Sequence, residues 1–118
     1  MEINEITAAV VDALEDIKGE DIVVLDVSHL TSMFDRMIIA SADSTRQTKA
    51  LAHNVQAKLK ALGVEDQGIE GLNSGEWVLL DLGSVVVHVM QPAVRQYYNL
   101  EELWSAAQAQ RTARNAAH

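Results

Sequence analysis

The sequence predicts an α/β fold: a single domain with a five-stranded mixed sheet and helices mainly on one side. Three observations support this class. Segments with the apolar spacing of helices are interspersed with short runs rich in β-branched residues. A length of 118 residues is enough for one hydrophobic core but not for two domains of ordinary size. The sequence has a single proline and shows neither an internal repeat nor a linker.

Two long helices are expected. Over residues 2–18 apolar side chains recur at steps of three and four positions, and the pattern stops at Gly19. A second apolar stripe predicts a helix over about residues 45–62. Ser44 and Gln47 have the spacing of a capping box, in which each side chain bonds the backbone N–H of the other residue.

The first three strands are expected from short apolar runs between these helices. Residues 22–27 are rich in β-branched side chains, which favours a strand. Residues 28–34 show no period and are expected to form a loop. Residues 37–40 form a second short apolar run, typical of a buried strand. Residues 64–70 are a weaker strand candidate, followed by a glycine-containing loop at residues 71–75.

The clearest local pattern is a β-hairpin. Two apolar runs, 77–82 and 85–90, flank Gly83-Ser84, which fits a two-residue turn. The turn sets the register, so that one face is wholly aliphatic: Val78, Leu80, Leu82, Val85, Val87 and Val89. Five of these side chains are expected to be buried against helices: Val78, Leu80, Val85, Val87 and Val89. The other face is mixed, as expected of a surface with a function: Trp77, Leu79, Asp81, Val86, His88 and Met90.

The C-terminal region is expected to be helical. A proline after the hairpin opens a short helical turn. A final helix is predicted over residues 100–109, with Leu103 and Trp104 facing the core. Because large apolar side chains are missing after this helix, the domain is expected to cover residues 1–107, and residues 108–118 to form a frayed tail.

The charge balance points to a basic partner. Seventeen acidic residues against nine Lys and Arg give a net charge of −8, which argues against non-specific nucleic-acid binding. Arg46, Lys49, Lys58 and Lys60 place positive charge on the second expected helix. Such residues usually solvate an exposed face, and a minor contact with RNA stays an open alternative. No apolar run is long enough for a membrane span, the N-terminus resembles no targeting signal, and a cytoplasmic protein is expected.

Enzyme and metal sites are not expected. The four histidines lack the spacing of a metal site, there is no cysteine, and no cofactor is predicted. The segment before Thr45 has neither a glycine nor the lysine of a phosphate-binding loop. Gly83-Ser84 is similar to the Gly-Ser that opens nucleotidyltransferase sites. No pair of carboxylates follows it to hold magnesium.

Three residues of the types most enriched in tight interfaces occur near the mixed hairpin face: Trp77, Arg95 and Tyr98. A plain core position for Trp77 is the alternative. Together with the mixed face itself, these side chains favour a protein-binding surface over a catalytic one.

Several short motifs add a family resemblance. They are Phe34-Asp35 with Ile38-Ile39, Ser44-x-Arg46-Gln47, Glu70-Gly71, Trp77-Val78-Leu79-Leu80-Asp81-x-Gly83, Val86-Val87-His88, and Arg95-x-x-Tyr98-x-Leu100-Glu101-x-Leu103-Trp104. No single motif is specific. In this order and spacing, from Lys18 to Trp104, the sequence resembles the ribosomal silencing factor family, RsfS or Iojap.

The resemblance implies a nucleotidyltransferase-like fold without catalytic residues. It also implies a function: binding to universal protein fourteen of the large ribosomal subunit, which blocks association with the small subunit and represses translation. Carried over by position, the partner-facing residues are Trp77, Asp81, Leu82, His88 and Tyr98, and Met90 and Arg95 complete the predicted surface. Leu82 fits this surface only if the strand bends near Gly83, because the hairpin register places it on the aliphatic face.

Two functions from other classes are rivals. One is a residual nucleotidyltransferase that uses Ser44, Asp81 and Glu101. The other is a homodimerisation module whose open sheet face pairs with a second copy. A nucleotide-transfer assay separates the first rival from the silencing factor, and sedimentation with isolated large subunits separates the second.

Overall fold

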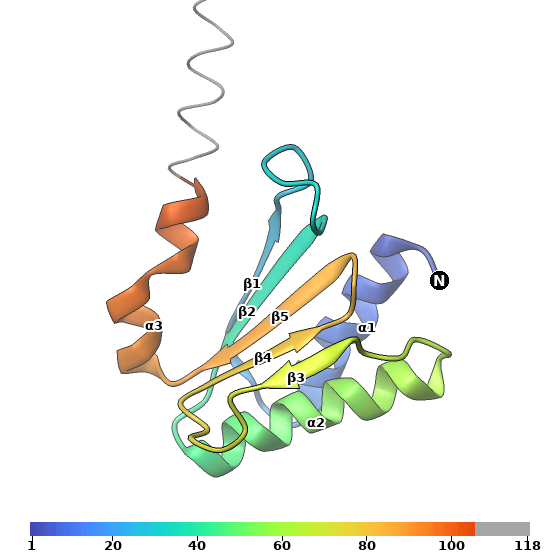
Figure 1. Cartoon of the computed structure of the whole chain (residues 1–118). Helices are drawn as coiled ribbons and strands as arrows, with labels where there is room; N and C mark the ends of the chain where they lie inside the picture. The colour runs from blue at the N-terminus through green and yellow to red at the C-terminus, as the bar shows by residue number, and fades with distance from the viewer. Residues whose placement is uncertain (106–118) are drawn as a thin grey trace, which may run out of the picture.

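The computed structural model describes residues 1–105 (Figure 1). The predicted tail, residues 108–118, and the end of the predicted last helix lie outside the described residues. The elements in chain order are α1 (Ile3–Asp16), β1 (Glu20–Asp26), β2 (Arg36–Ser41), α2 (Thr45–Ala61), β3 (Gly68–Glu70), β4 (Trp77–Asp81), β5 (Val85–Met90) and α3 (Pro92–Tyr98). A last helical segment covers residues 100–105. No helix among residues 1–105 is long and apolar enough to cross a bilayer.

The five strands form one mixed sheet, as predicted, and the structure gives their order as β1-β2-β5-β4-β3. Strands β2 and β5 are parallel, and the other three pairs are antiparallel. All six residues of β5 are buried, since this strand lies at the centre of the sheet with protein on both faces. Helices α1 and α2 cover one face, and α3 lies on the other side (Figure 1).

The hairpin register is the predicted one. Val78 lies opposite Val89, Leu80 opposite Val87, and the Leu82 N–H donates to the Val85 carbonyl at 2.9 Å. The turn needs Gly83, whose φ of +88° is costly for residues with a side chain. The five hairpin side chains expected to be buried on the aliphatic face, Val78, Leu80, Val85, Val87 and Val89, are all buried.

The two long helices are fixed to each other by side chains of α2. Ser44 caps α2 by accepting from the Gln47 backbone N–H at 3.0 Å, as the capping box predicts. The Gln47 side chain does not return to the cap. Its Nε2 donates to the carbonyl of Ile17 at 2.6 Å, just after α1, while the side chain of Asn54 bonds the carbonyl of Ala13. The tertiary contact has therefore replaced one half of the predicted box.

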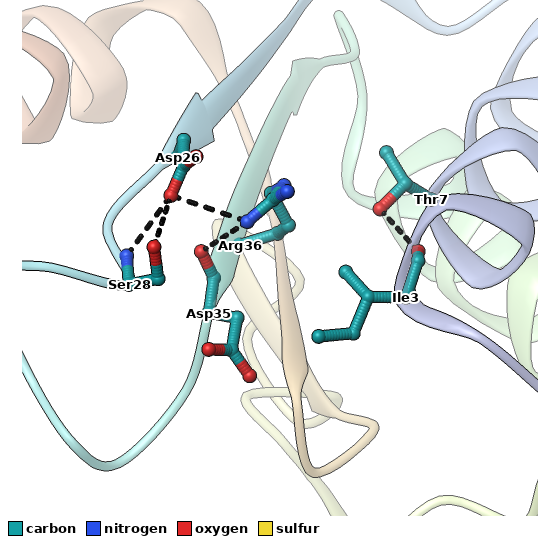
Figure 2. A network of polar contacts seen from close by, with 6 residues as sticks. All are labelled: Ile3, Thr7, Asp26, Ser28, Asp35 and Arg36. Atoms are coloured by element: carbon teal, nitrogen blue, oxygen red, sulfur yellow. Dashed lines mark hydrogen bonds and ion pairs between the residues drawn. The ribbon is translucent and has the colours of Figure 1, made fainter.

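The loop between β1 and β2 is closed by a polar network, which Figure 2 shows. The Asp26 carboxylate accepts from the backbone N–H and the hydroxyl of Ser28, at 3.1 and 2.7 Å, and pairs with Arg36 at 3.1 Å. The Ser28 hydrogen bonds, reinforced by the Arg36 charge, lower the pKa of Asp26. The same loop is also tied to the hairpin turn. The Asp35 N–H donates to the Ser84 carbonyl at 2.7 Å, and this bond holds Phe34 beside the turn.

The second face of the sheet is more covered than predicted. Met37, Ile39 and Met90 form a small buried cluster there, and α3 and residues 100–105 pack on part of it. Within the last segment, Trp104 faces this cluster as expected, but Leu103 is 63% exposed. The prediction for Leu103 was wrong because Leu100 and Trp104, four positions apart, form the inner side of the helical turn.

Candidate functional site

An aromatic cluster of Trp77, His88 and Tyr98 lies on the face of the sheet away from α1 and α2. Trp77 at the start of β4 donates its Nε1–H to Nδ1 of His88 at 2.9 Å. The rings of Trp77 and Tyr98 lie 4.8 Å apart between centroids. Tyr98 is 53% exposed and Trp77 is half-buried, so the cluster presents aromatic surface to solvent from a fixed base.

A cleft of about 840 Å³ lies on the same face as the cluster. It is lined by Met33, Phe34, Met37, Gln67, Leu79, Asp81, Gly83, Ser84, Val86, His88, Leu100 and Trp104. Most of these side chains are apolar, and Asp81 is the only one that carries a formal charge. Its carboxylate accepts from the Gly83 N–H at 2.8 Å, which orients it within the cleft. A concave apolar surface with one carboxylate fits an apolar group that has a cation beside it.

One wall of this cleft could not be placed from the sequence. Phe34 and Trp104 lie 70 positions apart, and their rings meet edge to face with centroids 5.9 Å apart. Phe34 reaches this position because Asp35 is tied to the hairpin turn, and Trp104 because the last helical segment returns to the sheet. The only sequence signal was that both residues are large and aromatic.

Arg95, predicted as a contact residue, is engaged inside the protein. Its Nε donates to Glu101 at 2.6 Å and its guanidinium donates to the Ser41 hydroxyl at 2.7 Å. The side chain is only 12% exposed. It joins α3, the end of β2 and the last helical segment across the left-handed corner at Asn99. Arg95 therefore positions Tyr98 and the Trp104 wall of the cleft.

Two other predicted site residues lie in the core. Leu82 follows β4 and packs in the cluster under α1 and α2, because the strand does not bend enough at Gly83 to change the side of Leu82. Met90 points to the same face as Trp77, but it is fully buried beneath the aromatic cluster. The exposed part of the predicted surface thus consists of Trp77, Asp81 and Tyr98, with His88 buried behind them.

The residues of the rival catalytic reading each hold a structural hydrogen bond. Ser44 caps α2, Glu101 accepts from Arg95, and Asp81 accepts from Gly83. Across residues 1–105 there is no group of three His, Cys, Asp or Glu side chains that could hold a metal ion.

Burial lowers the pKa of His88 from 6.5 to about 4. A neutral His88 also suits the accepting role of Nδ1 toward the Trp77 indole. Because the unfolded chain takes up this proton near pH 6.5 and the folded chain only near pH 4, acid favours unfolding between these values.

We therefore expect the free energy of unfolding to fall by up to about 3 kcal/mol through this group as the pH drops from 6.5 to 4. Urea titrations of the wild type and of His88→Gln at pH 6.5, 5.5, 4.5 and 4 measure it. The variant, which has no imidazole at this position, should show the weaker pH dependence over that range. Parallel curves for the two proteins would contradict the buried neutral state.

A sequence model of the family described as "Ribosomal silencing factor during starvation" matches residues 1–118. The chain belongs to the ribosomal silencing factor family. A ribosomal silencing factor of Chromobacterium violaceum is 64% identical over 104 residues, which cover 88% of this chain and 85% of the relative. Another from Haemophilus influenzae is 43% identical over 94 residues, covering 80% and 92%.

Solved structures agree with the family assignment. A crystal structure of a Chromobacterium violaceum protein superposes with a TM-score of 0.88 at 63% identity, covering 89% of this chain and 88% of the other. One from Bacillus halodurans superposes with a TM-score of 0.78 at 38% identity, covering 86% and 94%. The family of ribosomal silencing factors also extends to eukaryotes. A mouse relative, 34% identical over 98 residues, is named for mitochondrial assembly of the large ribosomal subunit.

Proposed function

We propose that this silencing factor binds universal protein fourteen of the large ribosomal subunit and thereby blocks association with the small subunit. The aromatic cluster carries the proposal, because Trp and Tyr side chains on a rigid base are the commonest anchors of tight interfaces. Two further features support it. The net charge of −8 suits a basic ribosomal protein, and Asp81 offers a carboxylate to a cation of that partner.

The proposed mechanism needs no chemical step. A body of 12.9 kDa docked on the surface where the subunits meet occupies space that the small subunit requires. An interface of about 1,600 Å² in total, the usual size for a stable complex, is within reach of this face. The protein would act in the cytoplasm, where subunits join, and would repress translation by occupancy alone.

We expect the order of addition to decide the effect. Added to large subunits before small subunits, the protein should suppress the light-scattering rise of subunit joining in proportion to its amount, up to one copy per large subunit. Added to joined ribosomes under conditions that prevent dissociation, it should have little effect, because the small subunit already covers the site. Equal inhibition in both orders, or inhibition far below one copy per ribosome, would favour a catalytic mechanism.

The homodimer rival is tested with the same material. Sedimentation of the protein alone and with isolated large subunits separates the two interpretations. A protein that self-associates through its open face but does not travel with large subunits would contradict the proposal.

A further inference from the structure

The positive charge of this protein is concentrated on helix α2, a feature that the proposed function does not explain. All seventeen Asp and Glu residues lie outside α2, whereas four of the nine Lys and Arg residues lie within it. Helix α2 covers the face of the sheet opposite the aromatic cluster. An acidic protein therefore carries one strongly basic helix on its far side.

The cations of α2 form a stripe. Arg46, Lys49 and Lys60 are separated by three and eleven positions, which places them on one side of the helix. We call these three residues the α2 stripe; it spans about 21 Å along the helix axis. Leu51, Val55 and Leu59 occupy the buried side of the same helix. Lys58 points elsewhere and pairs with Asp16 of α1 at 3.4 Å.

The stripe is not explained by structural needs. Within residues 1–105, Arg46, Lys49 and Lys60 form no ion pair. Arg46 also sits in the first turn of α2, where the helix dipole favours acidic side chains, and that turn has none. Like charges three and four positions apart repel each other. The positions of Arg46 and Lys49 are therefore unfavourable for the helix itself. Unfavourable local choices of this kind are typical of functional surfaces.

The stripe begins at the end of the sheet that carries the aromatic cluster. The loop before Trp77 rests on the first turns of α2, since the Thr48 hydroxyl bonds the carbonyl of Gly75. An added Cβ at Gly75 would lie only 2.9 Å from Cε of Lys49. The loop that leads into Trp77 thus joins the N-terminal end of the stripe to the strand that carries the aromatic cluster on its other face.

We propose that the α2 stripe is a second docking surface, which binds the phosphate backbone of ribosomal RNA beside the protein partner. The inference rests on the proposed function, because it places this surface on the large subunit. Three cations without an ion pair among the described residues, on one side of a helix, fit the phosphate groups of an RNA backbone. RNA repels a protein of net charge −8, and the stripe supplies a local attraction that offsets this repulsion. The protein can therefore bind next to ribosomal RNA on the large subunit.

The test is the salt dependence of binding to purified large subunits. The triple variant Arg46→Gln, Lys49→Gln, Lys60→Gln should bind more weakly, and the slope of log affinity against log salt should become shallower by about two units. Lys60→Gln and Lys18→Gln are matched single variants, because both remove one exposed cation and only the first lies on the stripe. Lys18→Gln should leave the slope of the wild type unchanged.

A stability measurement separates docking from folding. Arg46→Gln should melt at the temperature of the wild type or slightly above it, because it removes a cation from a helix N-terminus. An unchanged salt slope in the triple variant would overturn the inference. So would a salt slope that becomes shallower by the same amount in Lys18→Gln as in Lys60→Gln.

Failure of the proposed function gives a different result. Purified universal protein fourteen without RNA should bind the wild type and the triple variant equally well. If the wild type does not bind large subunits at all, the salt series is read with RNA extracted from them. RNA binding by the wild type that is lost in the triple variant then supports the stripe as an RNA-binding surface. Absence of RNA binding by the wild type at low salt overturns the inference.

Discussion

Trp77→Ala is expected to abolish co-sedimentation with large ribosomal subunits while leaving a folded domain. The indole is half-buried, contacts the tilted ring of Tyr98 and is held by its hydrogen bond to His88, so it meets a partner in a fixed position. Loss of such an anchor costs about 2 kcal/mol or more of binding free energy, roughly a 30-fold loss of affinity. Sedimentation at several protein concentrations measures the affinity, and circular dichroism reports the fold.

Two controls sharpen this experiment. Trp77→Phe keeps an aromatic ring but loses the N–H that binds His88, so it isolates the effect of orientation. Tyr97→Ala removes an aromatic side chain that is 82% exposed and touches the cluster only through the ring of Tyr98, with centroids 5.1 Å apart, and it should change binding less than Trp77→Ala. Unchanged binding of Trp77→Ala would remove Trp77 from the interface. Unfolding of that variant would show that its main role is in the core.

Leu80→Ala should lower the free energy of unfolding by roughly 2 to 4 kcal/mol. Leu80 is 1% exposed, lies opposite Val87 and belongs to the core under α1 and α2. The rigid sheet leaves a cavity where the isobutyl group was, because neighbouring strands cannot close around it. Urea unfolding of the wild type and of Leu80→Ala measures the difference in their free energies of unfolding.

Leu79→Ala is the matched control for this prediction. It removes the same number of atoms from the next position of β4, on the cleft side, where Leu79 is only half-buried. We expect a smaller loss of stability, since part of that side chain already contacts water. Equal losses for the two variants would contradict the assignment of faces.

The sequence predicted local structure well, because turn and cap residues act on their immediate neighbours. Gly83-Ser84 set the register of β4 and β5, and Ser44 marked the start of α2. The arrangement of the second face was not predictable in this way. It depends on contacts between distant residues, such as Arg95 with Ser41 and Phe34 with Trp104, that leave no periodic signal.

The grouping of the candidate site residues was predicted in part for the same reason. Alternation along β4 correctly grouped Trp77, Asp81 and the paired His88 on one face. The resemblance to the family added Leu82, which the register itself placed on the opposite face, and there the register agrees with the structure. Arg95 was chosen by residue type, and type alone cannot tell an exposed guanidinium from one that bonds Ser41 and Glu101.

The central position of β5 affects how this protein folds during its synthesis. Its odd-numbered valines complete the core under the helices, and Met90 completes the cluster on the other face, yet β5 is the last strand among the described residues to be synthesised. Its parallel partner β2 lies far upstream, so the pairing must close a long loop. A nascent chain that ends before Val85 has unfilled cores and uncovered strand edges. A member of the ribosomal silencing factor family therefore cannot complete either core until the ribosome has made β5.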